Sequence, residues 1–106
     1  KRPKMAHIAS QLSTQAIFTS DNPRSENPQT ILDEMEDGVS PENYRKTLTV
    51  LDRRQAIKTA CKLSETGDII LIAGKGHENY QEVNGVRSHF DDLEEVTNCF
   101  NQLKKN

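Results

Sequence analysis

The chain has 106 residues and a formal net charge of -2, which is enough for one domain with a single core. It is 33% hydrophobic and 28% charged, with a mean hydropathy of -0.79, so it is polar for a globular domain but able to build a core. The acidic balance argues against a nucleic-acid-binding module. No apolar run approaches the ~18 residues that a membrane span needs.

The first half of the chain predicts two helices around a strand. Residues 3–12 have a helical period, residues 16–20 form a short apolar run typical of a buried strand, and residues 28–38 start at a proline and stop at Gly38. In the first helix Met5, Ile8 and Leu12 are expected on one face with Ala6 and Ala9, and in the second Ile31, Leu32 and Met35 are expected to face inward.

The second half predicts two strands, two helices and a hairpin. After a connector at 39–46, residues 47–51 are β-branched and apolar, and residues 52–67 form an amphipathic helix pattern. The run "DIILIA" at 68–73 does not alternate, which favours a strand buried on both faces. Asn84-Gly85 is a strong hairpin signal. In the last helix, 91–105, Asp92 and Glu95 resemble a capping box. The side chains expected to be buried in these two helices are Ala56, Ile57, Ala60, Cys61, Ser64, Leu93, Val96, Phe100 and Leu103.

The two cysteines, Cys61 and Cys99, each lie inside an apolar helical pattern and outside any CxxC or metal-binding spacing. This predicts two buried free thiols, in agreement with a reducing cytoplasm.

The alternation of helices and strands predicts an open, mostly parallel α/β sheet with helices on both faces, followed by a C-terminal β-hairpin and helix. Ligands of such sheets bind at the carboxyl ends of the strands. The loops 21–27 and 74–79 each follow a predicted strand, so we expect them at the same edge of the sheet.

The loop "AGKGHENYQ" is not a phosphate loop, because it lacks the G-x-x-x-x-G-K-[ST] spacing and a hairpin follows instead of a helix. Gly74 and Gly76 allow close backbone approach to a ligand, and Glu78 could pair with an ammonium group. His77 is either a base or a residue that bonds its own neighbourhood. Lys75 is expected to be solvated or near a phosphate rather than a nucleophile.

The loop "SDNPRSENP" is either a proline-rigid turn or a ligand-binding loop. In the second interpretation Pro23 fixes the backbone, so that Asn22 and Arg24 are presented in a set geometry and Arg24 grips a carboxylate. Together with Glu78 this makes a clamp for a small zwitterion such as an amino acid.

Taken together, "TSDNPRSENP", "GDIILIAGKGHENYQ" and "FDD" resemble, over essentially the whole chain, the C-terminal domain of UDP-N-acetylmuramoyl-tripeptide synthetases. These are the Mur ligases that add the third residue of the peptidoglycan stem peptide. The resemblance implies a Rossmann-like domain of an ATP-dependent amide ligase, with UDP-MurNAc-L-Ala-D-Glu as the other substrate. The D-N-P-R pattern is that of members using meso-diaminopimelate.

The resemblance also implies residue roles. Asn22 and Arg24 would hold the distal carboxylate of meso-diaminopimelate, and the Gly74 carbonyl and Glu78 would take its distal ammonium. Supporting roles in the two loops would fall to Asp21, Pro23, Lys75, Gly76 and His77.

Departures from the family pattern matter as well. The uridine-binding N-terminal domain, the central domain that binds ATP and Mg²⁺, and a G-G-D-R stretch with its preceding strand are not in this sequence. We therefore expect residues 1–106 to be a C-terminal domain that is inactive alone and binds no cofactor. We also expect it to lack one strand and to self-associate through an exposed sheet edge. Two alternatives stay open: a stand-alone nucleotide- or metabolite-binding module, and an interaction domain without a ligand.

Overall fold

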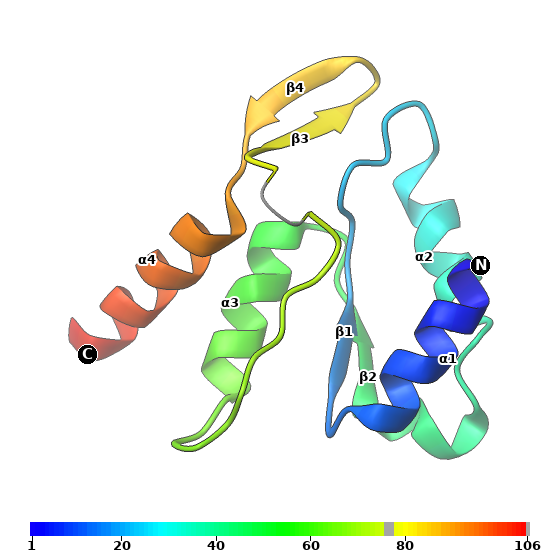
Figure 1. Cartoon of the computed structure of the whole chain (residues 1–106), viewed down its shortest axis with the longest axis horizontal. Helices are drawn as coiled ribbons and strands as arrows, with labels where there is room; N and C mark the ends of the chain where they lie inside the picture. The colour runs from blue at the N-terminus through cyan, green and yellow to red at the C-terminus, as the bar shows by residue number, and fades with distance from the viewer. Residues whose placement is uncertain (76–77, 106) are drawn as a thin grey trace.

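The computed structural model describes residues 1–75 and 78–105 of the chain, a flat molecule of 38 × 37 × 19 Å (Figure 1). Helices and strands follow one another much as the sequence predicts. In chain order they are α1 (Arg2–Leu12), β1 (Ala16–Phe18), α2 (Pro28–Glu36), the 3-10 helix η1 (Pro41–Lys46), β2 (Thr47–Thr49), α3 (Arg53–Leu63), β3 (Tyr80–Val83), β4 (Val86–His89) and α4 (Asp92–Lys105).

Two small sheets are formed. Strand β1 pairs in parallel with β2, with Ile17 opposite Leu48, and β3 pairs antiparallel with β4. The hairpin turns at Asn84 and Gly85, whose φ angles of 51° and 80° are those of a type I′ turn. The predicted hairpin and the mixed α/β fold class are confirmed.

A first core cluster fills the space between α1, β1 and α2. Leu32 of α2 is fully buried there, and Asn27 caps that helix by accepting hydrogen bonds from the amides of Gln29 and Thr30. Gly38 is required at the end of α2, because a Cβ there would lie 1.9 Å from the carbonyl oxygen of Pro3. The buried members of this cluster are Ala6, Ala16, Phe18, Leu32 and Val39.

The predicted apolar face of α1 is buried only in part. Its large apolar side chains Met5, Ile8 and Leu12 are exposed, and the buried residues are the small Ala6 and Ser10. A narrow stripe of small residues lets α1 pack closely against α2, and there is no room on that side for the larger side chains.

A second core cluster lies between α3 and α4 and consists of Ile57, Cys61, Phe90 and Cys99. Both cysteines are buried free thiols, as predicted. The predicted stripe of α4 is partly wrong, because Leu93 is 76% exposed and the helix buries Cys99 and packs Val96 against the cluster. The capping residue is Asp91, whose Oδ1 accepts from the Glu94 amide, so the expected Asp92 and Glu95 box is not formed.

The prediction of a strand at 68–73, buried on both faces, is also wrong. In the described part of the chain β1 pairs only with β2, and no strand pairs with this segment. Ile70 and Ile72 pack against the second core cluster, whereas Ile69 and Leu71 are 94% and 87% exposed. The segment therefore has the alternating sides of a strand, but it lacks the neighbour that a ladder requires.

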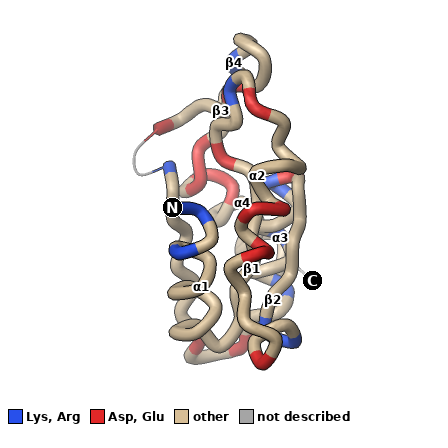
Figure 2. The backbone as a smooth tube through the Cα atoms, turned by 90° about the vertical axis from the view of Figure 1, so that its right-hand side faces the viewer, with Lys and Arg blue, Asp and Glu red and all other residues tan. Residues whose placement is uncertain are grey.

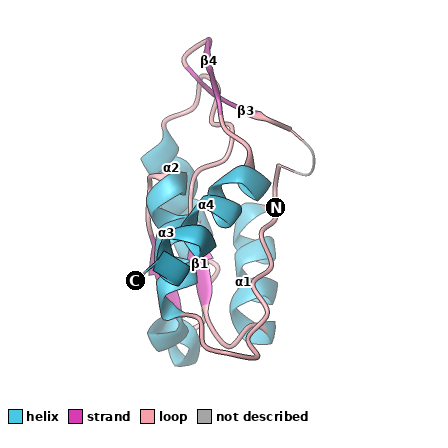
Figure 3. Ribbon diagram, turned by 90° about the vertical axis from the view of Figure 1, so that its left-hand side faces the viewer, coloured by secondary structure: helices cyan, strands magenta, loops and turns pink. Residues whose placement is uncertain are grey.

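The arrangement of the elements positions the candidate site. Figure 3 shows the helices packed around the short central strands, with the β3–β4 hairpin projecting beyond one end of them. The loop 21–27, which connects β1 with α2, runs beside this hairpin (Figure 1) and bonds to it through the backbone of Arg24.

Candidate functional site

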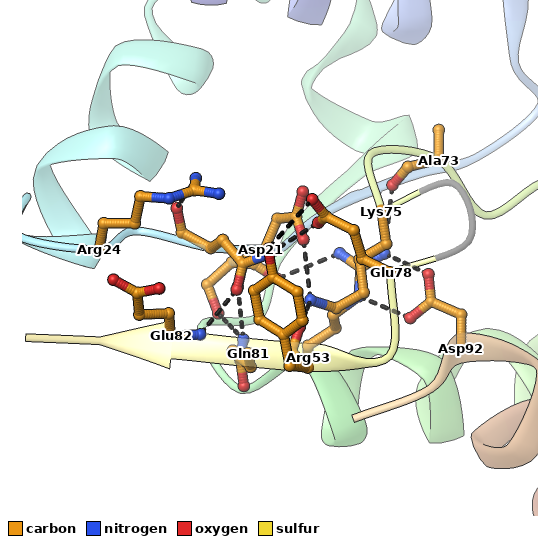
Figure 4. A network of polar contacts seen from close by, with 12 residues as sticks. Asp21, Arg24, Arg53, Ala73, Lys75, Glu78, Gln81, Glu82 and Asp92 are labelled. Atoms are coloured by element: carbon orange, nitrogen blue, oxygen red, sulfur yellow. Dashed lines mark hydrogen bonds and ion pairs between the residues drawn. The ribbon is translucent and has the colours of Figure 1, made fainter. Parts of the chain in front are cut away.

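Two loops that are distant in the sequence meet beside strand β3 (Figure 4). The side-chain amide Nδ2 of Asn22 donates to Oε1 of Glu78 at 2.9 Å, and Nζ of Lys75 lies 3.0 Å from Oδ1 of Asp21. The prediction that loops 21–27 and 74–79 lie at the same edge is thus confirmed for their described residues.

Strand β3 fixes the start of loop 21–27. The side chain of Gln81 donates to the carbonyl of Asp21 at 2.8 Å, and the amide of Glu82 donates to Oδ1 of Asn22 at 2.7 Å. The Asn22 amide group has two N–H bonds, and among the described residues Glu78 accepts from one of them.

Arg24 is held in an unusual backbone conformation. Its φ of 55° lies in the left-handed region, which non-glycine residues seldom adopt. Two backbone hydrogen bonds to the hairpin keep it there, from the Arg24 amide to the Glu82 carbonyl at 3.0 Å and from the Asn84 amide to the Arg24 carbonyl at 2.7 Å. Pro23 before it is buried, so the rigid turn expected from the sequence is formed.

The guanidinium of Arg24 is directed to the surface at the edge of the contact network (Figure 4). Its hydrogen bond is to the carbonyl of Asn22, at 3.4 Å. Among the residues that the structure describes, it forms no ion pair with a carboxylate. This cation is therefore fixed at its backbone and available to an anionic group.

Glu78 is a half-buried carboxylate with a set orientation. Oε1 accepts from Asn22, and the hydroxyl of Tyr80 donates to Oε2 at 3.5 Å. The amide of Glu78 donates to the Lys75 carbonyl at 3.0 Å. Its remaining lone pairs can accept hydrogen bonds from an ammonium group.

Gly74 lies where the second loop approaches the first. Its φ of 113° favours glycine, and a Cβ at this position would stand 3.1 Å from Oδ2 of Asp21. The sequence argument for a close backbone approach is consistent with this geometry. Gly76 and His77, which the sequence also singled out, lie outside the described residues.

Lys75 corrects the sequence interpretation, because it is neither solvated nor placed as a phosphate ligand. Its side chain is 0% exposed, and Nζ donates to the Tyr80 carbonyl at 2.6 Å and lies 5.6 Å from the centroid of the Phe90 ring. The Asp21 contact is an ion pair without hydrogen-bond alignment, since the buried Oδ1 accepts no hydrogen bond within the described part. The contacts with Asp21 and Phe90, which lie far from Lys75 in the sequence, could not be predicted from the loop alone.

Sequence reasoning also missed Arg53 and Asp92. Arg53 is 3% exposed and forms a 2.7 Å ion pair with Asp92 behind the two loops. The only sequence signal is a charged residue at the start of each helix, which is ordinarily a solvated position.

No metal centre or membrane span accompanies these loops in the described residues. No group of three His, Cys, Asp or Glu side chains there could hold a metal ion, and no helix there is both long and apolar enough to cross a bilayer. Figure 2 shows charges of both signs distributed along the chain rather than gathered into one basic face. The two loops have the charges to hold an anion at Arg24 and a cation at Glu78.

Comparison with known proteins places this geometry in a family. Residues 1–76 match the family described as Mur ligase, glutamate ligase domain. The chain is 55% identical, over 95% of its length, to a protein of Bacteroides thetaiotaomicron named UDP-N-acetylmuramoyl-L-alanyl-D-glutamate–2,6-diaminopimelate ligase. It is 62% identical, over 87% of its length, to the protein of that name from Cytophaga hutchinsonii.

A solved structure of a ligase with the same name superposes with a TM-score of 0.90 at 45% identity, covering 98% of this chain and 21% of that one. The chain likewise spans about a fifth of the length of the curated relatives, with 21% of the Bacteroides thetaiotaomicron protein and 19% of the Cytophaga hutchinsonii protein covered. With a matched family and a nearly superposable fold, the chain belongs to the Mur ligase glutamate ligase domain family.

Proposed function

We propose that residues 1–106 are the C-terminal, amino-acid-binding domain of a cytoplasmic ATP-dependent ligase that joins meso-diaminopimelate to UDP-MurNAc-L-Ala-D-Glu in peptidoglycan synthesis. In this reaction ATP phosphorylates the glutamate carboxylate, the amine of diaminopimelate attacks the acyl phosphate, and an amide bond forms as phosphate leaves. ATP and Mg²⁺ would be bound by a central domain outside this sequence. The names of the relatives support this assignment.

The observation that carries the proposal is an exposed cation, Arg24, which has no ion pair among the described residues, near the oriented carboxylate of Glu78 on a converging loop. Arg24 and an N–H of Asn22 would bind the distal carboxylate of diaminopimelate. Glu78 and the Gly74 carbonyl would accept hydrogen bonds from its distal ammonium. Charged hydrogen bonds of this kind are roughly twice as strong as neutral ones.

This geometry favours diaminopimelate over L-lysine. Lysine supplies the distal ammonium but no distal carboxylate, so Arg24 and Asn22 would have no partner in the closed site. Leaving such groups unpaired costs several kcal/mol, which corresponds to ~10²–10⁴-fold discrimination.

A titration of the ¹⁵N-labelled chain tests the binding part of the proposal. With meso-diaminopimelate we expect shifts of the Asn22, Arg24, Gly74 and Glu78 amides, and with L-lysine none of comparable size. Arg24→Ala should remove the response, whereas Arg45→Ala, which removes an exposed arginine on η1, should keep it. Equal responses to both amino acids would contradict the assigned clamp. Shifts of residues 74–79 with a nucleotide alone would favour the nucleotide-binding alternative.

A chimeric enzyme tests the proposed reaction. The C-terminal domain of the Bacteroides thetaiotaomicron relative, which is 55% identical in this region, is replaced by this chain. We expect ATP-dependent ligation of meso-diaminopimelate, its loss in the Arg24→Ala chimera and its retention in the Arg45→Ala chimera. A folded chimera that ligates L-lysine as well as diaminopimelate would overturn the proposal.

A further inference from the structure

One buried side chain contacts the residue that precedes each loop of the site. Nη1 of Arg53 donates to the carbonyl of Ser20 at 3.1 Å, and Nη2 donates to the carbonyl of Ala73 at 3.2 Å (Figure 4). Ser20 directly precedes loop 21–27, and Ala73 directly precedes loop 74–79. The guanidinium of Arg53 thus joins the bases of both loops.

Asp92 sets the orientation of this guanidinium. Its carboxylate accepts from Nε at 2.8 Å and from Nη2 at 2.7 Å, a two-point contact that fixes the plane of the group. The N–H bonds left on the opposite side then point at the two carbonyls. A lysine at this position could not reproduce the contact, because its ammonium is a single point donor.

Arg53 also connects the parts of the molecule that contain the first and the second core cluster. Ser20 follows β1, which belongs to the first core cluster, whereas Ala73 ends the segment that packs against the second. In the described residues no strand pairing connects β1 with the 68–73 segment. The spacing of the two loop bases therefore depends on side chains, and Arg53, which contacts both bases, is 3% exposed.

We infer that Arg53 is a positioning residue of the two-loop site, which sets the distance between the Arg24 and Glu78 loops and is itself oriented by Asp92. This inference rests on the proposed function only for the identity of the ligand. A ligand that must reach both loops, such as diaminopimelate, depends on that spacing. A ligand held by Glu78 alone, such as lysine, depends on it much less.

The test compares Arg53→Lys with Arg54→Lys in this chain. Both keep the charge at neighbouring positions of α3, but Arg54 is half-exposed and pairs with Glu95 away from the loop bases. Hydrogen exchange is followed at the amides of Arg24, Glu78 and Glu82, which bond within or between the loops and the hairpin. The amide of Asp37, bonded to the Asp33 carbonyl at the end of α2, is the reference amide away from the two loops. Asp92→Asn is a second variant. It removes the carboxylate that orients Arg53 but leaves Arg53 able to donate to the carbonyls of Ser20 and Ala73.

In Arg53→Lys we expect the loop amides to exchange about tenfold faster, the effect of one lost charged hydrogen bond, with Asp37 unchanged. Asp92→Asn should act in the same direction and Arg54→Lys should have no effect. The dissociation constant for diaminopimelate should rise about tenfold in Arg53→Lys and that for lysine should not. Unchanged loop exchange, or equal acceleration at Asp37, would overturn the inference. If the unsubstituted chain fails to bind diaminopimelate, the proposed function fails, while the exchange result still decides the role of Arg53.

Discussion

The ammonium group of Lys75 lies 3.0 Å from a carboxylate oxygen of Asp21, and the two residues come from different loops. The environments of the partners differ, because the Lys75 side chain is 0% exposed and that of Asp21 is 34% exposed. The same ammonium donates to the Tyr80 carbonyl at 2.6 Å. A desolvated cation with two oxygen partners therefore lies beneath the candidate site.

Lys75→Met should lower the free energy of unfolding by about 1–3 kcal/mol. The substitution keeps much of the apolar stem but leaves the Tyr80 carbonyl and the partly buried Asp21 without their cation. Urea unfolding followed by circular dichroism measures the change. Lys62→Met, at an exposed position of α3, is the control and should stay within about 0.5 kcal/mol. A Lys75→Met protein as stable as the parent would show that this buried ion pair contributes no net stability.

The side chain of Arg24 should strengthen ligand binding, while a side chain at this position lowers the stability of the fold. At its φ of 55° a side chain is disfavoured, so Arg24→Gly should be about 0.5–1 kcal/mol more stable than Arg24→Ala. Both variants remove the guanidinium and should lose diaminopimelate binding equally. Thermal unfolding and the ligand titration measure the two effects separately. Equal stability of the glycine and alanine variants would mean that the two hydrogen bonds to the hairpin leave no strain at this residue.

Local signals in the sequence predicted the parts of the fold that depend on neighbouring residues. Asn84-Gly85 produced the hairpin, because its positive φ angles suit a type I′ turn. Pro28 begins α2, with Leu32 buried, as the helical period indicated. The predicted proximity of loops 21–27 and 74–79 is confirmed by the contact between Asn22 and Glu78, although the 68–73 segment before the second loop pairs with no strand in the described residues.

The features that the sequence could not supply depend on packing partners far along the chain. The apolar run 68–73 would be fully buried only if other elements covered both of its sides. In the described residues no strand pairs with it, and Ile69 and Leu71 are exposed. In α1 the predicted face held both Met5 and Ala6, and close packing against α2 buries the small Ala6 while Met5 stays exposed. Buried charges such as Lys75 and Arg53 are hidden from sequence patterns, because most lysines and arginines are solvated.

His89 should titrate above its ordinary pKa of 6.5. The hydrogen bond from its ring to Glu94, 2.9 Å away, raises the pKa of His89, and the negative charges of Glu94, Asp91 and Glu95 add to the shift. Since the folded-state pKa exceeds the unfolded one, the stabilisation is fully present below about pH 6.5 and is lost as the pH rises through the folded-state pKa.

An NMR titration of the His89 ring measures this effect. Glu94→Gln should bring the pKa of His89 back toward 6.5, and 1 M salt should do so in part, because the pair is solvent-exposed. Glu36→Gln, which removes an exposed carboxylate at the end of α2, should leave the titration unchanged. An unshifted His89 in the unsubstituted chain would mean that the pair with Glu94 is not populated in solution.

The outer side of the 68–73 segment should drive self-association of the chain. Ile69 and Leu71 are 94% and 87% exposed, and in the described residues the backbone between them is paired with no strand. An exposed apolar edge with free N–H and C=O groups is a template for pairing with another chain. Sedimentation equilibrium should therefore show an apparent mass that increases with concentration.

The Ile69→Lys and Leu71→Lys double variant should remain monomeric up to a concentration at least about tenfold higher than that at which the unsubstituted chain associates, because charge on an edge opposes pairing. Its stability should be little changed, since both side chains point away from the core cluster that Ile70 and Ile72 contact. Leu63→Lys, at a half-exposed leucine at the end of α3, is the matched control and should associate as the parent does. If the parent is monomeric throughout, or if Leu63→Lys disrupts association equally, the 68–73 edge is not the surface through which the chains pair.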